Sequence, residues 1–158
     1  MTHHQLVAAL LNSQTTLALA TVAEDGSPHI APLFYLAGEA LDLCWLSSAS
    51  SVHSRNLKRN PAAAVAVYSP AASWREIRGV QMRGPVTVVH ERAERHRIVE
   101  AYVERFQLGA LFRARIARSR IYRFQPEWIR YLDNTAHFGY KFELTIGASD
   151  DPRSGDCG

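Results

Sequence analysis

The sequence contains little cysteine and no long apolar run, and each shortage excludes a class of protein. Its two cysteines, Cys44 and Cys157, lie far apart and provide neither a disulfide framework nor the spacing of a zinc site. No window approaches the ~18 consecutive apolar residues of a membrane-spanning helix, and no cationic, apolar leader opens the chain. We therefore expect a cytoplasmic protein that does not enter a membrane.

Several motifs of enzyme chemistry are also missing. The sequence has no GxGxxG, no GxSxG and no convincing pair of carboxylates. His3 and His4 are an isolated pair near the N-terminus, so we assign no metal. Ordinary surface or packed positions explain His29, His90, His96 and His137, so we assign no catalytic residue.

Lysine is scarce, although the chain is mildly basic. Of its 18 basic residues only Lys58 and Lys141 are lysine, and 15 acidic residues leave a formal net charge of +3. Many arginines stand beside glutamate, as in Glu91-Arg92, which is typical of solvated faces. A nucleic-acid binder gathers its cations on one face, so we expect no nucleic-acid partner.

What is present is a chain of 158 residues, 47% of them hydrophobic, which suffices for one packed core. The apolar patterns predict helices over 3–12, 52–59 and 93–106, and strands over 15–23, 28–36, 40–46, 62–68 and 81–89, with the last strands around Pro126 within 121–132. Gly84-Pro85 inside one strand indicates a bulge, a bend or an edge position. We expect a small β-barrel with helices as one domain, residues 1–146, followed by a flexible polar tail, residues 147–158.

The most informative segment is residues 46–61, LSSASSVHSRNLKRNP, which follows a predicted strand. Its serines offer hydroxyl donors, and a helix start adds free backbone N–H groups and partial positive charge. This combination favours an anion such as phosphate. An ordinary N-cap serine before a solvated basic helix explains the same residues, so the local sequence leaves both interpretations open.

The order of elements resembles the pyridoxamine-5′-phosphate-oxidase-like family of FMN-binding split barrels, over roughly residues 15–132. The most specific match is Ser51, His53, Asn56 and Leu57 followed by Asn60-Pro61, and a second is the run Arg78-Gly79-Val80-Gln81-x-x-Gly84. The resemblance implies a six-stranded antiparallel split β-barrel. It also implies a homodimer that holds FMN in two clefts between its subunits.

The resemblance further implies which residues hold the cofactor, namely Ser47, Ser51, His53, Arg55, Asn56, Gln81 and Lys141. According to this resemblance, Ser51 and His53 bind the phosphate, and Arg55 or the helix-start amides assist them. Ser47 contacts the ribityl chain or the edge of the flavin ring.

For the other positions in this set, two roles are compatible with the sequence. Asn56 either bonds the phosphate or caps the local turn, and Gln81 faces either the flavin or solvent. The segment from Asp133 to Lys141 either folds over the cleft, with Lys141 reaching an anionic group, or forms a terminal strand. The backbone from Pro32 to Phe34 would lie along the flavin ring, whereas simple packing explains Trp74 better than a role as a cap.

Two departures from the founding oxidase separate this chain from it. Ile30 and Tyr35 stand where that enzyme has Arg and Lys, and its carboxy-terminal substrate motif has no counterpart here. Vitamin B6 oxidation is therefore not expected, and the resemblance points to an uncharacterised bacterial branch.

The function that follows is that of an FMN-binding flavoprotein, an oxidoreductase that passes electrons or hydride through FMN to a small organic acceptor. A non-catalytic flavin- or haem-binding module for storage, sensing or partner binding is the alternative, as is an F420-dependent reductase. The sequence specifies neither the substrate nor the electron donor.

Overall fold

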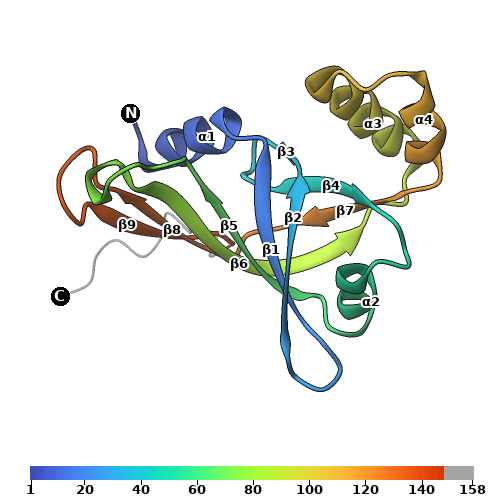
Figure 1. The fold of residues 1–158 in the computed structure, drawn as a ribbon, viewed down its shortest axis with the longest axis horizontal. Helices are drawn as coiled ribbons and strands as arrows, with labels where there is room; N and C mark the ends of the chain where they lie inside the picture. Colours follow the sequence, from blue (N-terminus) through green and yellow to red (C-terminus); the bar gives the residue numbers. More distant parts are fainter. Residues whose placement is uncertain (148–158) are drawn as a thin grey trace, which may run out of the picture.

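A strongly curved antiparallel sheet forms the body of the protein, in a computed structural model that describes residues 1–147 (Figure 1). The expected tail lies, apart from Gly147, outside the described residues. The helices are α1 (His3–Ser13), α2 (Val52–Arg59), α3 (Arg92–Phe106) and α4 (Ala110–Ala117). The strands are β1 (Thr16–Val22), β2 (Pro28–Phe34), β3 (Leu36–Ala37), β4 (Leu43–Ser47), β5 (Ala62–Tyr68), β6 (Arg78–Val88), β7 (Arg120–Phe124), β8 (Trp128–Asp133) and β9 (Lys141–Thr145).

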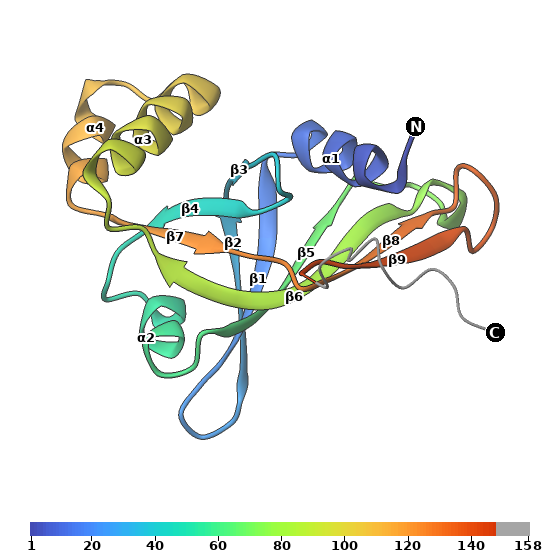
Figure 2. The same ribbon diagram turned by 180° about the vertical axis from the view of Figure 1, so that it is seen from behind.

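The strands follow the order β2-β1-β5-β6-β7-β4-β3, with β8 paired to β6 and β9 paired to β8 (Figure 2). The path from β2 to β4 contains the six strands of the expected barrel, and the β8–β9 hairpin extends from β6. β6 pairs with β5 along one edge, while its other edge pairs first with β8 and then with β7.

Gly84 lies where β6 changes partner from β8 to β7. A Cβ atom at this position would stand 2.0 Å from the carbonyl oxygen of Gln125, so only glycine permits this approach of the two backbones. The pairing of β6 with β5 runs through Gly84-Pro85 in unbroken register, so the expected bulge is absent, and the glycine is required instead by the link from β7 to β8 that passes against it.

The core fills the inside of the curved sheet. Trp45 of β4 is 0% exposed, and Tyr35, Phe124 and Met82 are equally enclosed. α1 closes one end of this core with Val7, Leu10 and Leu11. A reciprocal cap begins α1, since the Thr2 hydroxyl accepts from the Gln5 N–H and the Gln5 side chain accepts from the Thr2 N–H.

α2 begins and ends where the sequence predicts. Ser51 is its N-cap, with a side-chain oxygen that accepts from the Ser54 N–H, and Asn60-Pro61 ends it because proline disfavours helical geometry in the preceding residue. Leu57 and Asn56 are buried toward the sheet, and α2 packs on β1. The helix therefore holds a fixed position after β4.

α3 and α4 form a separate pair beyond the ends of β4 and β7 (Figure 1). Of their apolar residues, Tyr102, Val103 and Ile116 are buried, while Leu111 remains 92% exposed. α3 agrees with the predicted helix 93–106, whereas no helix was expected over 110–117. The expected strand 40–46 begins only at Leu43, because Leu41 has a left-handed backbone with φ of 63°.

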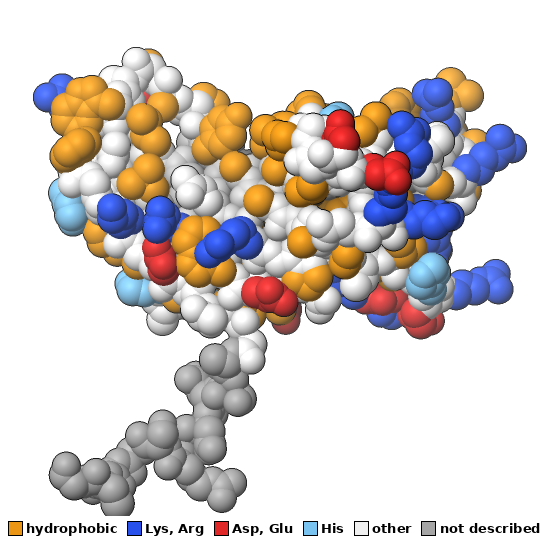
Figure 3. Space-filling view, turned by 90° about the horizontal axis from the view of Figure 1, so that it is seen from below, with side chains coloured by type: hydrophobic (Ala, Val, Ile, Leu, Met, Phe, Trp, Pro, Cys, Tyr) orange, Lys and Arg blue, Asp and Glu red, His pale blue; other side chains and the backbone are white. Residues whose placement is uncertain are grey.

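Charged side chains are mixed on the face that is seen from below (Figure 3). Lys and Arg side chains project mainly at the right-hand end, the end that carries α2, α3 and α4, with acidic groups between them.

Candidate functional site

Two serines and a histidine converge where β4 turns into α2. The Ser47 Oγ lies 2.6 Å from the His53 Nε2, and the Ser51 Oγ lies 3.0 Å from the same nitrogen. The two hydroxyl oxygens are 3.3 Å apart. Ser47 ends β4, Ser51 caps α2 and His53 lies in the first helical turn, so local geometry alone brings these groups together.

The imidazole of this cluster is buried and favours its neutral form. His53 is 7% exposed, and burial together with the nearby His29 lowers its pKa from the ordinary value of 6.5. Both hydroxyls contact the same ring nitrogen, Nε2, so in the neutral imidazole the tautomer decides whether this nitrogen accepts from the hydroxyls or donates to them. An anion placed beside it would favour the protonated ring and raise its pKa.

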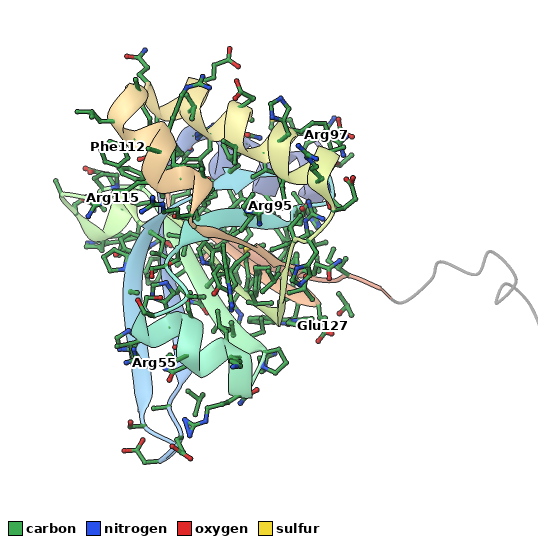
Figure 4. The ribbon with its side chains drawn as sticks, turned by 90° about the vertical axis from the view of Figure 1, so that its right-hand side faces the viewer. Arg55, Arg95, Arg97, Phe112, Arg115 and Glu127 are labelled. Atoms are coloured by element: carbon green, nitrogen blue, oxygen red, sulfur yellow. The ribbon has the colours of Figure 1, made fainter. Side chains whose placement is uncertain are left out.

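The start of α2 supplies further donors. The first N–H groups of a helix have no intrahelical partner and carry partial positive charge. Arg55, one turn into the helix, donates to the Ser50 carbonyl and is exposed at the surface, where Figure 4 places it on α2. Hydroxyls, helix-start amides and a guanidinium on one corner are the donor set that a phosphate requires, so these residues fit the phosphate end of FMN.

Asn56 has a partner inside the protein. Its side-chain Nδ2 donates to the Thr21 Oγ1 at 3.0 Å, and both residues are buried. The bond ties α2 to β1 and so positions the serine and histidine cluster against the sheet. A direct role of Asn56 at a phosphate stays a prediction.

Gln81 and Lys141 lie away from this cluster within one chain. Gln81 is an exposed residue of β6, opposite Ala66 of β5 and Arg130 of β8. Lys141 begins β9, the strand at the other end of the molecule from α2 (Figures 1 and 2). The segment from Asp133 to Lys141 is the connecting turn between β8 and β9, with only its two ends in strands, and the cofactor roles of Gln81 and Lys141 stay predictions.

The two positions that lack the cations of the founding oxidase have different surroundings. Tyr35 is fully buried, and its hydroxyl donates to the Leu11 carbonyl at 2.6 Å, so this position serves the core. Ile30 is 67% exposed on the outer face of the sheet. Trp74 is half exposed in a short 3-10 turn, Trp74–Glu76, and its ring meets that of Phe138 edge to face at 5.1 Å.

Sequence reasoning missed a hollow of about 540 Å³ beside the cluster. Ser47 and Ser48 line it, together with Tyr102 of α3, Phe112 and Arg115 of α4, and Arg118 just after α4. Arg115 and Arg118 lie about seventy positions after Ser47, so only the path of α3 and α4 brings them close.

Among residues 1–147, no group of three or more His, Cys, Asp or Glu side chains has the arrangement of a metal site. No helix in the same range combines the length and the apolar character needed to cross a membrane.

The curved antiparallel sheet with α2 placed after β4 is a split β-barrel, the fold class that the sequence predicted. Residues 4–133 match the family described as pyridoxamine 5′-phosphate oxidase. Since this match covers most of the chain, the protein belongs to the pyridoxamine 5′-phosphate oxidase family. No curated protein sequence matches the chain significantly.

Solved structures share this fold at low sequence identity. A conserved hypothetical protein of Mycobacterium tuberculosis is 22% identical with a TM-score of 0.75, over 94% of each chain. A putative pyridoxamine 5′-phosphate oxidase of Listeria innocua is 19% identical with a TM-score of 0.68, over 82% of this chain and 98% of that one. HutZ, the haem storage protein of Vibrio cholerae, is 21% identical with a TM-score of 0.66, over 80% of this chain and 92% of its own. These likenesses establish the fold alone.

Proposed function

We propose that the protein is a homodimeric FMN-binding oxidoreductase that passes electrons or hydride to a small organic acceptor. The observation that carries this proposal is the convergence of the Ser47 and Ser51 hydroxyls on His53 at the start of α2. These groups, with Arg55 and the helix-start amides, would hold the cofactor phosphate. FMN itself supplies the redox chemistry when bound, so the protein needs no nucleophile of its own.

In the proposed homodimer, the outer face of the sheet forms the interface between the two subunits. Around Ile30 this face presents small side chains and forms a shallow hollow of about 430 Å³, lined among others by Ala18, Ala20, Ala64 and Ala66. Exposed apolar surface of this kind favours association with a second sheet. In such a dimer the partner chain would supply Gln81 and Lys141 to a cofactor cleft that one chain alone does not complete. Sedimentation analysis that finds a monomer at micromolar concentration would contradict this part.

The first test is the absorption spectrum of the purified protein, with mass analysis of whatever ligand copurifies. Flavin bands and the mass of FMN support the proposal, and bleaching by NADH or NADPH with recovery on adding an acceptor supports turnover. A preparation that stays colourless and binds no FMN on titration would refute it. The mass also distinguishes FMN from the deazaflavin F420.

Variants test the phosphate seat, which is the group formed by Ser47, Ser51, His53, Arg55 and the helix-start amides of α2. Changing Ser51 and His53 together to Ala should weaken FMN binding by ~1.5 to 3 kcal/mol for each charge-assisted bond lost. Because Ser51 also caps α2, Ser47→Ala provides a second variant that leaves the cap intact. Ser50→Ala is the matched control, since its hydroxyl bonds only within the exposed loop to Ser48. Unchanged FMN affinity in both site variants would overturn the assignment.

A second candidate function is a haem-binding module without turnover. The structural likeness to HutZ, whose name describes a haem storage protein, favours this alternative. The same spectrum separates the two, because haem gives an intense Soret band that flavins lack. A Soret band in the purified protein, without flavin bands, would replace the first proposal by the second.

A further inference from the structure

The hollow beside Ser47 has the size and the lining of a site for a small organic molecule. At about 540 Å³ it falls within the range of small-molecule pockets, which is roughly 300 to 1,000 Å³. It lies between the end of β4 and the α3–α4 pair, so strand and helices both contribute to its wall.

Part of the lining of the hollow is apolar and largely aromatic. Phe34 of β2, Tyr102 of α3 and Phe112 of α4 line it, together with Leu108 and Ile116. Phe34 and Phe112 are each about half exposed, so part of each ring is open to contact with a ligand. A wall of this kind gains most from contact with a flat hydrocarbon body.

The hollow is also lined by two arginines without acidic partners. Within residues 1–147, no carboxylate lies within ion-pair distance of Arg115 or Arg118, whereas Arg113 on the same helix pairs with Glu100 at 3.1 Å. Figure 4 places Phe112 and Arg115 together on α4. Two guanidiniums that no protein carboxylate neutralises favour a carboxylate on the ligand.

The helix pair that forms this wall is fixed to the barrel at both ends of α3. Arg95 donates to the carbonyls of Val89 and Ser119, and Arg105 donates to those of Asn12 and Gln14. The hollow is therefore a built feature of the fold.

We propose that this hollow binds the organic substrate and selects a small aromatic carboxylate, with Arg115 and Arg118 as the residues that recognise the acid group. The inference rests on the proposed function, because Ser47 belongs both to the phosphate seat and to the lining of the hollow. A molecule bound in the hollow therefore lies next to the groups that would hold FMN.

The test compares a charged probe with a neutral probe of the same shape, 2-naphthoate and 2-naphthamide. Each is titrated into the full-length protein, before and after saturation with FMN, and binding is followed by the methyl NMR signals of Leu108 and Ile116. We expect 2-naphthoate to bind at least about tenfold tighter, as one charge-assisted contact allows.

Three variants show which residues produce the preference for 2-naphthoate over 2-naphthamide. Arg115→Gln with Arg118→Gln should reduce the affinity for 2-naphthoate to that for 2-naphthamide. Phe112→Ala should weaken both probes by a similar factor. Arg113→Gln is the matched control on the same helix, and it should preserve the tenfold preference, since Arg113 already pairs with Glu100.

Three results would overturn the inference. They are the absence of saturable shifts at Leu108 and Ile116, equal affinity for the two probes, and loss of FMN affinity in the double arginine variant, which would assign the arginines to the phosphate. The titration without FMN also separates this inference from the proposed function, because a protein that binds no FMN still reports its preference between the probes.

Discussion

The barrel and the α3–α4 pair are stabilised in different ways. The barrel encloses large side chains completely, such as Trp45 and Phe124, and pairs nearly every strand along its length. The helix pair buries few side chains and leaves Leu111 exposed. Arginine side chains that bond backbone carbonyls connect it to the barrel, together with the contact of Phe106 with Phe34. Dense packing fixes the serine and histidine cluster, while the loosely packed pair leaves room for a ligand beside it.

The largest expected effect is the loss of a core side chain. Trp45→Ala removes a fully buried indole and should lower the free energy of unfolding by about 3 to 5 kcal/mol. Urea unfolding followed by circular dichroism measures the change. Trp74→Ala is the control, since Trp74 is half exposed and its loss should cost about 1 kcal/mol or less. Similar losses in the two variants would remove the contrast between core and surface.

A smaller change in the free energy of unfolding is expected when one methyl group is added in each region. Gly84→Ala in the barrel places a Cβ against the Gln125 backbone and should cost about 1 to 3 kcal/mol of unfolding free energy. Gly109→Ala before α4 meets no atom within 4 Å, and should cost only a few tenths to about 1 kcal/mol, because Ala is a poorer N-cap than Gly. Thermal unfolding of both variants compares them, and a larger loss at Gly109 would reverse the assigned order.

A local effect is expected at the anchor of α3. Arg105→Gln removes the bonds to the Asn12 and Gln14 carbonyls, so the amides of α3 should exchange with solvent faster while those of β5 and β6 keep their protection. Arg97→Gln is the matched control on the same helix. Hydrogen exchange measured by mass spectrometry distinguishes the elements, and uniform acceleration over the whole chain would show that the pair and the barrel unfold together.

The smallest expected effect is the dependence of the protein's stability on pH. Because the pKa of His53 is lowered in the folded state, the unfolded chain binds more protons below about pH 6.5, and stability should fall as the pH drops below that value. Unfolding free energies at several pH values should show this fall, and His53→Asn should show less of it. Bound FMN should raise the pKa of His53 in an NMR titration, whereas an unchanged pKa would place the phosphate elsewhere.

Much of the barrel could be predicted because its signals are local. The α2 boundaries follow from Ser51 and Asn60-Pro61, and the β1–β2 hairpin follows from alternating residues around a turn. α4 gave no such signal, since only Ile116 among its apolar residues is buried and no stripe arises. β4 begins late because Leu41 adopts a left-handed backbone that leucine rarely adopts.

The residues of the candidate site likewise fall into two groups, those that local sequence could predict and those that it could not. Ser47, Ser51 and His53 lie within seven consecutive residues, so a strand that turns into a helix brings them together and sequence reasoning could find them. Thr21, the partner of Asn56, comes from a distant segment, as do Arg115 of α4 and Arg118, which follows that helix. Their approach depends on how the sheet curves and where α3 is anchored, which no local pattern encodes.

The three tryptophans give this protein a set of optical reporters. Trp45 is enclosed in the core two positions before Ser47, Trp74 is half exposed near Phe138, and Trp128 has the guanidiniums of Arg83 and Arg130 over its ring at 4.3 and 5.3 Å. A flavin seated at Ser47 would quench the emission of Trp45 by energy transfer more strongly than that of a more distant indole. Single-tryptophan versions of the chain would therefore locate a coloured ligand by fluorescence alone, without a crystal.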